Sequence, residues 1–133
     1  MKKSAAIILA LVLALSMVFI PGCTTSAKAT TWYVKYCEYW KIAKRSAKIK
    51  GDKLYLKGKW EKVSKRFDSA KEKKIKETFR LTGKTKYYIE DTNAETVKNV
   101  SRKKFKKNMY NDVSCLSFKV RSGEVVEAIV SLN

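Results

Sequence analysis

The sequence contains no histidine, and this absence removes several kinds of active site at once. It excludes Ser-His-Asp and Cys-His nucleophilic sites, and it removes the commonest zinc ligand. Acidic residues are also few, 12 Asp and Glu against 30 Lys and Arg. Nothing in their spacing places two carboxylates across a cleft, as a glycosidase requires. We therefore expect a protein that is not an enzyme, with no catalytic residue, no cofactor and no metal site.

Two fragments of known binding motifs are too incomplete to change this expectation. Residues 83–85 (GKT) end like a phosphate-binding loop, but Thr78 stands where that loop needs its first glycine. Asp91, Asn93 and Glu95 alternate as calcium ligands do, but Thr96 stands where a calcium loop needs glycine. We interpret both segments as turns or exposed loops.

The one long apolar run lies near the N-terminus and predicts an export signal. Lys2 and Lys3 precede a run over residues 5–20 that only Ser16 interrupts, and residues 27–29 (AKA) offer a signal peptidase small side chains. The run is shorter than the about 20 residues that a membrane span needs. We expect residues 1–29 to direct export and residues 30–133 to form a single extracytoplasmic domain.

The end of this segment leaves two fates open. Residues 20–23 (IPGC) resemble the lipobox of bacterial lipoproteins, in which a cysteine after a small residue is acylated. Pro21 departs from that pattern, because its fixed φ restricts the extended fit that a peptidase needs. The domain is therefore expected either to be anchored to the outer face of the cell membrane through a lipid on Cys23 or to be secreted after Ala29.

Cysteine is scarce, and either fate leaves the same two thiols, Cys37 and Cys115. An even number of cysteines in an oxidising compartment predicts one disulfide between them. Such a long closed loop would stabilise the domain by about 4.5 kcal/mol in the chain-entropy model. The alternative is a pair of free, buried thiols.

Positive charge is abundant. The formal net charge is +18, and it falls to +15 without residues 1–29, which contain three lysines and no acid. Between positions 41 and 76 there are 15 basic residues and only four acids. Such a surplus indicates a polyanionic partner, either wall polymer, acidic lipid headgroups, glycosaminoglycan or nucleic acid. The alternative is a solubilising lysine surface with no specific partner.

Most of the domain has the two-residue period of β-strands. Ala47 and Ile49 alternate with lysines, and after a turn at residues 51–52 the positions Leu54, Leu56 and Trp60 do the same. This hairpin would have one apolar and one basic face. We predict that the basic face binds the polyanion, with strand 75–81 contributing to it, through Lys48, Lys50, Lys53, Tyr55, Lys57, Lys59, Lys76 and Arg80.

The second half of the domain predicts two more strands, a short helix and a final hairpin. The next strand includes Tyr87 and Ile89, and residues 91–99 are expected to be an irregular polar connection. Ser101 is typical of a helix N-cap, so we predict a helix over residues 102–109. Residues 116–121 and 126–132 alternate around a turn at residues 122–123, with Val126 predicted to face inward.

Aromatic residues gather in residues 32–42, namely Trp32, Tyr33, Tyr36, Tyr39 and Trp40. They suit a strand, which we favour, but several also fall on one helical face. Rings of this kind usually fill a core, and the other interpretation is a platform that stacks sugars or bases.

Together these elements predict a mainly β domain. It is a small antiparallel β-barrel or roll of five or six strands with one short helix before the last hairpin, and it resembles an oligonucleotide/oligosaccharide-binding (OB) barrel. The function we expect is binding of an anionic polymer at the cell envelope. The alternative is a secreted protein-binding module or inhibitor that uses residues 33–40 and 90–99.

Overall fold

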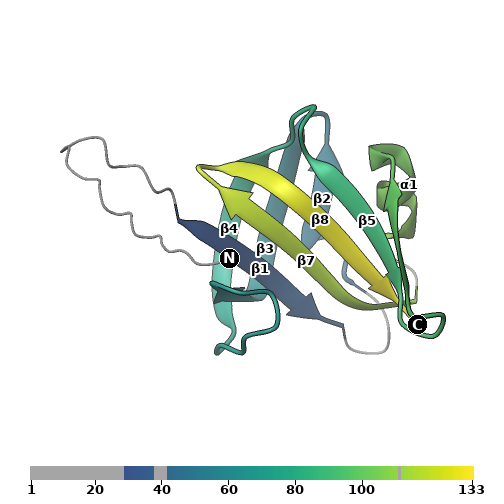
Figure 1. Ribbon diagram of the computed structural model, residues 1–133. Helices are drawn as coiled ribbons and strands as arrows, with labels where there is room; N and C mark the ends of the chain where they lie inside the picture. Colours follow the sequence, from purple (N-terminus) through teal and green to yellow (C-terminus); the bar gives the residue numbers. More distant parts are fainter. Residues whose placement is uncertain (1–28, 38–41, 111) are drawn as a thin grey trace, which may run out of the picture.

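The structure is a computed structural model that describes residues 29–37, 42–110 and 112–133. Eight strands and one helix follow one another along these residues (Figure 1). In chain order they are β1 (Thr30–Tyr36), β2 (Ala47–Lys50), β3 (Lys53–Val63), β4 (Lys73–Arg80), β5 (Lys86–Asp91), β6 (Thr96–Val100), α1 (Arg102–Asn108), β7 (Val113–Arg121) and β8 (Glu124–Leu132).

Five of the strands close into a barrel. Around it the order is β1, β3, β4, β8 and β7, and β7 pairs with β1 to complete the ring. The joint between β4 and β8 is parallel, with Arg80 opposite Glu124 and the Arg80 amide 2.9 Å from the Gly123 carbonyl oxygen. Numbered by their order along the chain, the barrel strands are β1, β3, β4, β7 and β8. The fourth of them, β7, lies beside the first, and the spatial order 4-1-2-3 of β7, β1, β3 and β4 is that of a Greek key. The predicted OB-like barrel is therefore confirmed.

The other strands extend the barrel wall. β2 pairs with the first half of β3, and β1 pairs with its last residues, so two short strands lie one after the other along β3. β5 lies parallel to β8, and β6 forms the outer edge beside β5. The expected count of five or six strands is right for the barrel but too low for the domain.

Aromatic side chains fill the barrel. Trp60, Phe105 and Phe118 are fully buried, and their rings form a chain with centroid distances of 6.0 and 6.1 Å. Phe105 comes from α1, which lies at the right of the barrel in Figure 1 and packs this side chain inward. As predicted, Ser101 caps the helix, its hydroxyl accepting a hydrogen bond from the Lys104 amide at 3.2 Å. Burial of Phe105 and Met109 fixes the helix on the barrel.

Two local predictions are wrong. Residues 96–100 form strand β6 and not an irregular connection, because β5 offers them a hydrogen-bonding edge. In the last hairpin Val125 is buried and Val126 is only half-buried. The register between β7 and β8 shifts between Lys119 and Val120, so Val125 takes the inward position predicted for Val126, whereas Ala128 and Val130 are buried as predicted.

Several predictions concern residues outside the described ones. The export segment up to residue 28, with Cys23, lies outside them, and so do Tyr39 and Trp40. Within residues 32–37 the predicted strand is confirmed as β1. No helix in the described part of the chain is long and apolar enough to span a membrane.

Candidate polyanion-binding face

The register of β2, β3 and β4 brings all eight predicted residues together. Lys48 lies opposite Tyr55 and Lys50 opposite Lys53 across β2 and β3. Across β3 and β4, Lys53 lies opposite Arg80 and Lys57 opposite Lys76. The alternate residues of the same strands, such as Leu54 and Leu56, are buried in the core. Side chains one residue apart point to opposite faces of a sheet, so the predicted residues share the outer face.

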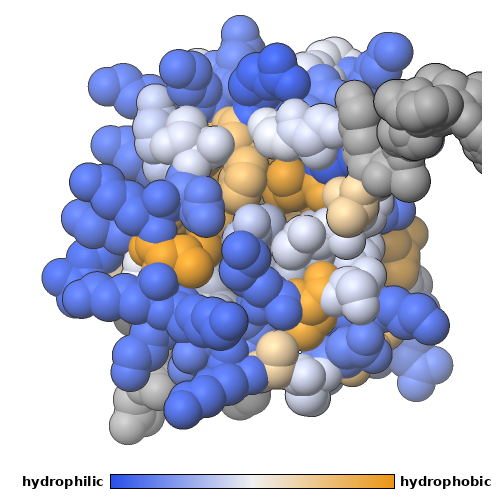
Figure 2. Space-filling model, turned by 90° about the vertical axis from the view of Figure 1, so that its left-hand side faces the viewer, coloured by the Kyte–Doolittle hydropathy of each residue, from blue (hydrophilic) through white to orange (hydrophobic). Residues whose placement is uncertain are grey.

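The structure adds Lys74 to this set, because Lys74 on β4 lies opposite Lys59 on β3. Sequence analysis missed it, since residues 64–74 contain no apolar alternation that would indicate a strand. We call the complete set the lysine face. It consists of Lys48, Lys50, Lys53, Tyr55, Lys57, Lys59, Lys74, Lys76 and Arg80, all exposed. Figure 2 views the side toward β4, β3 and β1 and shows hydrophilic side chains over most of it.

No cation of the lysine face forms an ion pair with a described residue, although Glu124 lies opposite Arg80 across the joint between β4 and β8. The ion pairs of the described residues lie elsewhere, and they join Arg66 to Glu90, Arg102 to Asp52, and Lys119 to Glu127. Four pairs of like charges stand directly opposite each other across neighbouring strands, and such pairs are destabilising. They are Lys50/Lys53, Lys53/Arg80, Lys57/Lys76 and Lys59/Lys74.

A hollow opens within the lysine face at Gly58. The φ of Gly58 is +87°, a backbone conformation that favours glycine. The space beside its Cα is open: a Cβ placed there would come no closer to another heavy atom than 3.8 Å, the distance to the Ser46 hydroxyl oxygen. Arg45, Lys57, Lys74 and Lys76 line this hollow together with Ser46, Gly58 and Ile75. Four cationic side chains around a small uncharged floor can hold an anionic group. Arg45 was not predicted, because it lies before the first strand of the hairpin.

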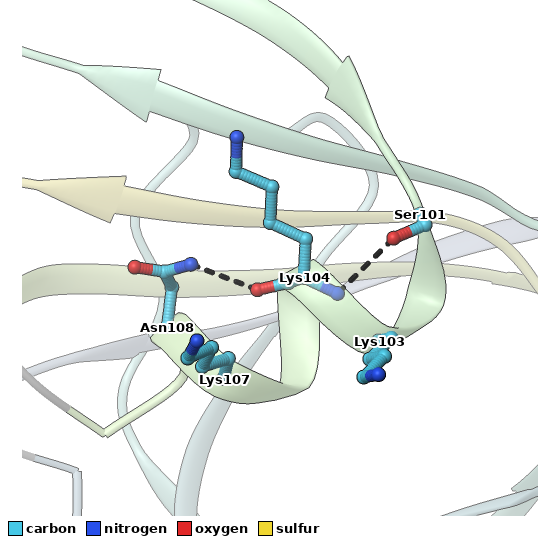
Figure 3. A pocket seen from close by; sticks show the side chains of 5 residues that line it. All are labelled: Ser101, Lys103, Lys104, Lys107 and Asn108. Atoms are coloured by element: carbon cyan, nitrogen blue, oxygen red, sulfur yellow. Dashed lines mark hydrogen bonds between the residues drawn. The ribbon is translucent and has the colours of Figure 1, made fainter.

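A second group of cations lies on α1. Five of its seven residues are basic, and its first turn contains no acid. Figure 3 shows a hollow beside this helix, lined by Ser101, Lys103, Lys104, Lys107 and Asn108. The Asn108 amide nitrogen donates to the Lys104 carbonyl oxygen at 2.8 Å, and the lysine side chains extend from the helix into the open. The sequence analysis did not predict this group, although the basic run at residues 102–107 could have indicated it.

A different arrangement occupies the outer face of β1, β7, β8 and β5. The Arg66 guanidinium lies over this face and binds both carboxylate oxygens of Glu90, at 2.9 and 3.3 Å. It also reaches the hydroxyls of Ser117 and Ser131, at 3.4 and 3.3 Å. Its hydrogen bonds hold the pKa of Glu90 below its ordinary value despite partial burial. We call this region, with the adjoining apolar residues Trp32, Val34, Val63 and Ile129, the Arg66 face.

The aromatic cluster mostly serves the core. Trp32 is buried against the Arg66 face, and Tyr33 is buried inside the barrel, 5.0 Å from Phe79 between ring centroids. Tyr36 is 52% exposed at the end of β1. Of the described members only Tyr36 is open to solvent, so they do not form a stacking platform.

The predicted disulfide between Cys37 and Cys115 is absent, and both residues are free thiols. Strand register gives the reason, because Cys115 lies opposite Tyr36 and so Cys37 points to the other face. Cys37 packs against the barrel core, whereas Cys115 packs against the Arg66 face. Burial raises the pKa of Cys37 to about 12 and also raises that of Cys115.

Comparison with known proteins adds no functional information. No family model matches the chain, and no curated protein or solved structure matches it. Among the described residues there is also no group of three or more acidic or cysteine side chains that could hold a metal ion.

Proposed function

We propose that this protein is a non-enzymatic small β-barrel that binds an anionic polymer through its lysine face. The polymer is a wall polymer, a glycosaminoglycan or a nucleic acid at the cell envelope, and the protein is secreted or anchored by a lipid on Cys23. One observation supports this best: four pairs of like charges stand opposite each other across β2, β3 and β4, and none of these cations forms an ion pair with a described residue. A polyanion placed over them would remove their repulsion and release its own counterions.

The position of the lysine face in the barrel agrees with this proposal. OB barrels bind oligonucleotides and oligosaccharides over their second and third strands. In this barrel those strands are β3 and β4, which contribute seven of the nine lysine-face residues. The fold analogy adds to the charge arrangement, which carries the proposal.

Retention on immobilised heparin tests the proposal. The domain should remain bound at physiological salt and elute in a steep salt gradient. Replacing Lys53, Lys57 and Lys59 by Glu should abolish retention, while a matched triple Lys→Glu variant should stay bound. The matched variant changes Lys84, Lys86 and Lys98, which are exposed on the β4–β5 turn, β5 and β6.

Both triple variants change the net charge equally, so they separate a localised site from general attraction. Thermal unfolding should be similar in the two. Elution of the unmodified domain below physiological salt would remove the proposal. Equal losses in the two variants would show that total charge, and not the lysine face, causes retention.

A second candidate function is binding of a protein, and it rests on the Arg66 face. Tyr36, Phe67 and Val97 are 52%, 81% and 60% exposed around it. Strand pairing puts Tyr36 and Val97 in one row across the sheet, through Cys115, Ser131 and Glu90. This row joins the two segments predicted for a protein-binding module. Binding through it should persist at high salt, unlike binding to a polyanion.

A further inference from the structure

The positive charge in the first turn of α1 is costly to the helix itself. Cations in a first turn oppose the helix dipole, and Arg102, Lys103 and Lys104 all lie there with no acid among them. Lys103 and Lys107 are also like charges at the destabilising i, i+4 spacing. The Ser101 cap and the buried Phe105 stabilise the helix without any need for this charge. The first-turn lysines Lys103 and Lys104 therefore have no evident structural role, whereas Lys106 and Lys107 lie in the last turn, where cations interact favourably with the helix dipole.

Contacts at the turn between β2 and β3 join α1 to the lysine face. The Arg102 guanidinium donates to the Gly51 carbonyl oxygen at 3.0 Å and to the Asp52 carboxylate at 3.1 Å. Lys50 and Lys53 flank this turn as a cross-strand pair. A hollow at the junction is lined by Gly51, Arg102, Lys103, Lys106 and Lys107, so lysines of the helix lie beside the turn.

The one acid at this junction is already neutralised. Asp52 is the sole acidic residue between Lys50 and Lys53, and its carboxylate is paired with Arg102. A negatively charged chain that passes from Lys53 through the turn to α1 would thus meet a carboxylate in that turn that is already paired, and Glu124 lies to the side of this path, opposite Arg80. The cations continue from one element to the other.

We propose that α1 extends the lysine face into a single binding track, and that the ligand is a long linear polyanion. This inference rests on the proposed function and specifies the shape of its ligand. Lys53 to Lys59 span about 20 Å along β3, at about 3.4 Å per residue. The helix adds about 10 Å at about 1.5 Å per residue. A short polyanion fills the lysine face alone, and a longer one also contacts Lys103, Lys106 and Lys107.

Heparin fragments of two lengths test this track. A short fragment spans about 20 Å, and a long one spans about 40 Å or more, enough for the strand and helix together. Affinities are measured for the unmodified domain, for a variant with Lys103, Lys106 and Lys107 replaced by Gln, and for a control with Gln at Lys84, Lys86 and Lys98. Replacement of the three α1 lysines by Arg gives a fourth protein that keeps the charge.

If the track exists, heparin affinity should fall only when the α1 Gln variant is combined with the long fragment. The α1 Gln variant should bind the long fragment on the order of tenfold more weakly, because contacts that release counterions are lost. Its salt dependence should become shallower by up to about one unit of slope for each lost lysine contact. Its affinity for the short fragment should not change. The Arg variant and the control should bind both fragments as the unmodified domain does.

Two results would overturn the track while leaving the proposed function intact. One is an α1 Gln variant that binds the long fragment as tightly as the unmodified domain. The other is an equal loss for both fragment lengths, which would indicate a general charge effect. Failure of the unmodified domain to bind heparin of either length would instead remove the proposed function itself.

Discussion

The lysine face and the Arg66 face lie on the outside of the same barrel, yet they treat charge in opposite ways. On the Arg66 face, a single arginine binds a carboxylate and two serine hydroxyls, and all four side chains are largely withdrawn from water. On the lysine face, eight cations stand exposed and form no ion pair within the described structure. Paired charge holds the fold together, and unpaired charge is available to a ligand. Net charge alone would not have distinguished the two faces.

The largest expected effect is on the reactivity of the two thiols, one of which packs against the barrel core and the other against the Arg66 face. Because burial raises the pKa of Cys37 from 9.0 to about 12, native protein should hold roughly a thousandfold less thiolate there at a given pH. Alkylation by iodoacetamide at mildly alkaline pH should be slow in the native state and fast after denaturation. Titration of denatured, unreduced protein should find both thiols. A mass that shows the two cysteines linked would contradict the register of β1 and β7.

Removal of the Arg66 side chain should have the next largest effect. Arg66→Ala leaves the half-buried Glu90 carboxylate without its partner, and the side chains of the pair are 14% and 25% exposed. We expect a loss of about 1–3 kcal/mol in the free energy of unfolding, below the cost of a fully buried pair. Urea denaturation measures this loss. An unchanged midpoint would mean that the Arg66 face does not stabilise the fold.

Acid should weaken the Arg66 face in the unmodified protein. The folded pKa of Glu90 is lowered, so its stabilising effect is present above the ordinary value of about 4.5 and is lost as pH falls through the folded value. The difference in melting temperature between the unmodified protein and Arg66→Ala should be constant above about pH 5 and should narrow below it. A difference that persists in strong acid would assign the effect to packing of Arg66 and not to its ion pair.

The smallest effect on stability is expected on the lysine face. Lys57→Ala and Lys76→Ala should each change the free energy of unfolding by no more than about 0.5 kcal/mol. The sign should tend toward stabilisation, because each removes one like-charge pair across β3 and β4. Urea denaturation in low salt is the measurement. A large destabilisation would show that these lysines serve the fold and would reverse the contrast between the faces.

Local patterns predicted the barrel well where neighbours in sequence determine the structure. The alternation in β3, the N-cap at Ser101 and the turn before β8 all depend on short stretches of chain. The lysine face follows from the same alternation, since it is the other side of β3 and its partners.

The remaining features depend on which distant segments meet. Nothing near Arg66 in the sequence indicates that it would lie on Glu90, 24 positions away. The separation of Cys37 from Cys115 depends on the pairing of β1 with β7, and a shift of one residue would have reversed it. The link from Arg102 to Gly51 likewise requires the closed barrel. The sequence thus predicted the local elements and the side chains on each face, but it did not predict which distant strands pair or in what register.

Backbone NMR during titration with heparin tests the central claim most directly. The account predicts that amide shifts concentrate on the lysine face in β2, β3 and β4, extend to α1 with long fragments, and disappear as salt is raised. Shifts centred on Tyr36, Phe67 and Val97 around the Arg66 face, or spread evenly over the barrel, would contradict it.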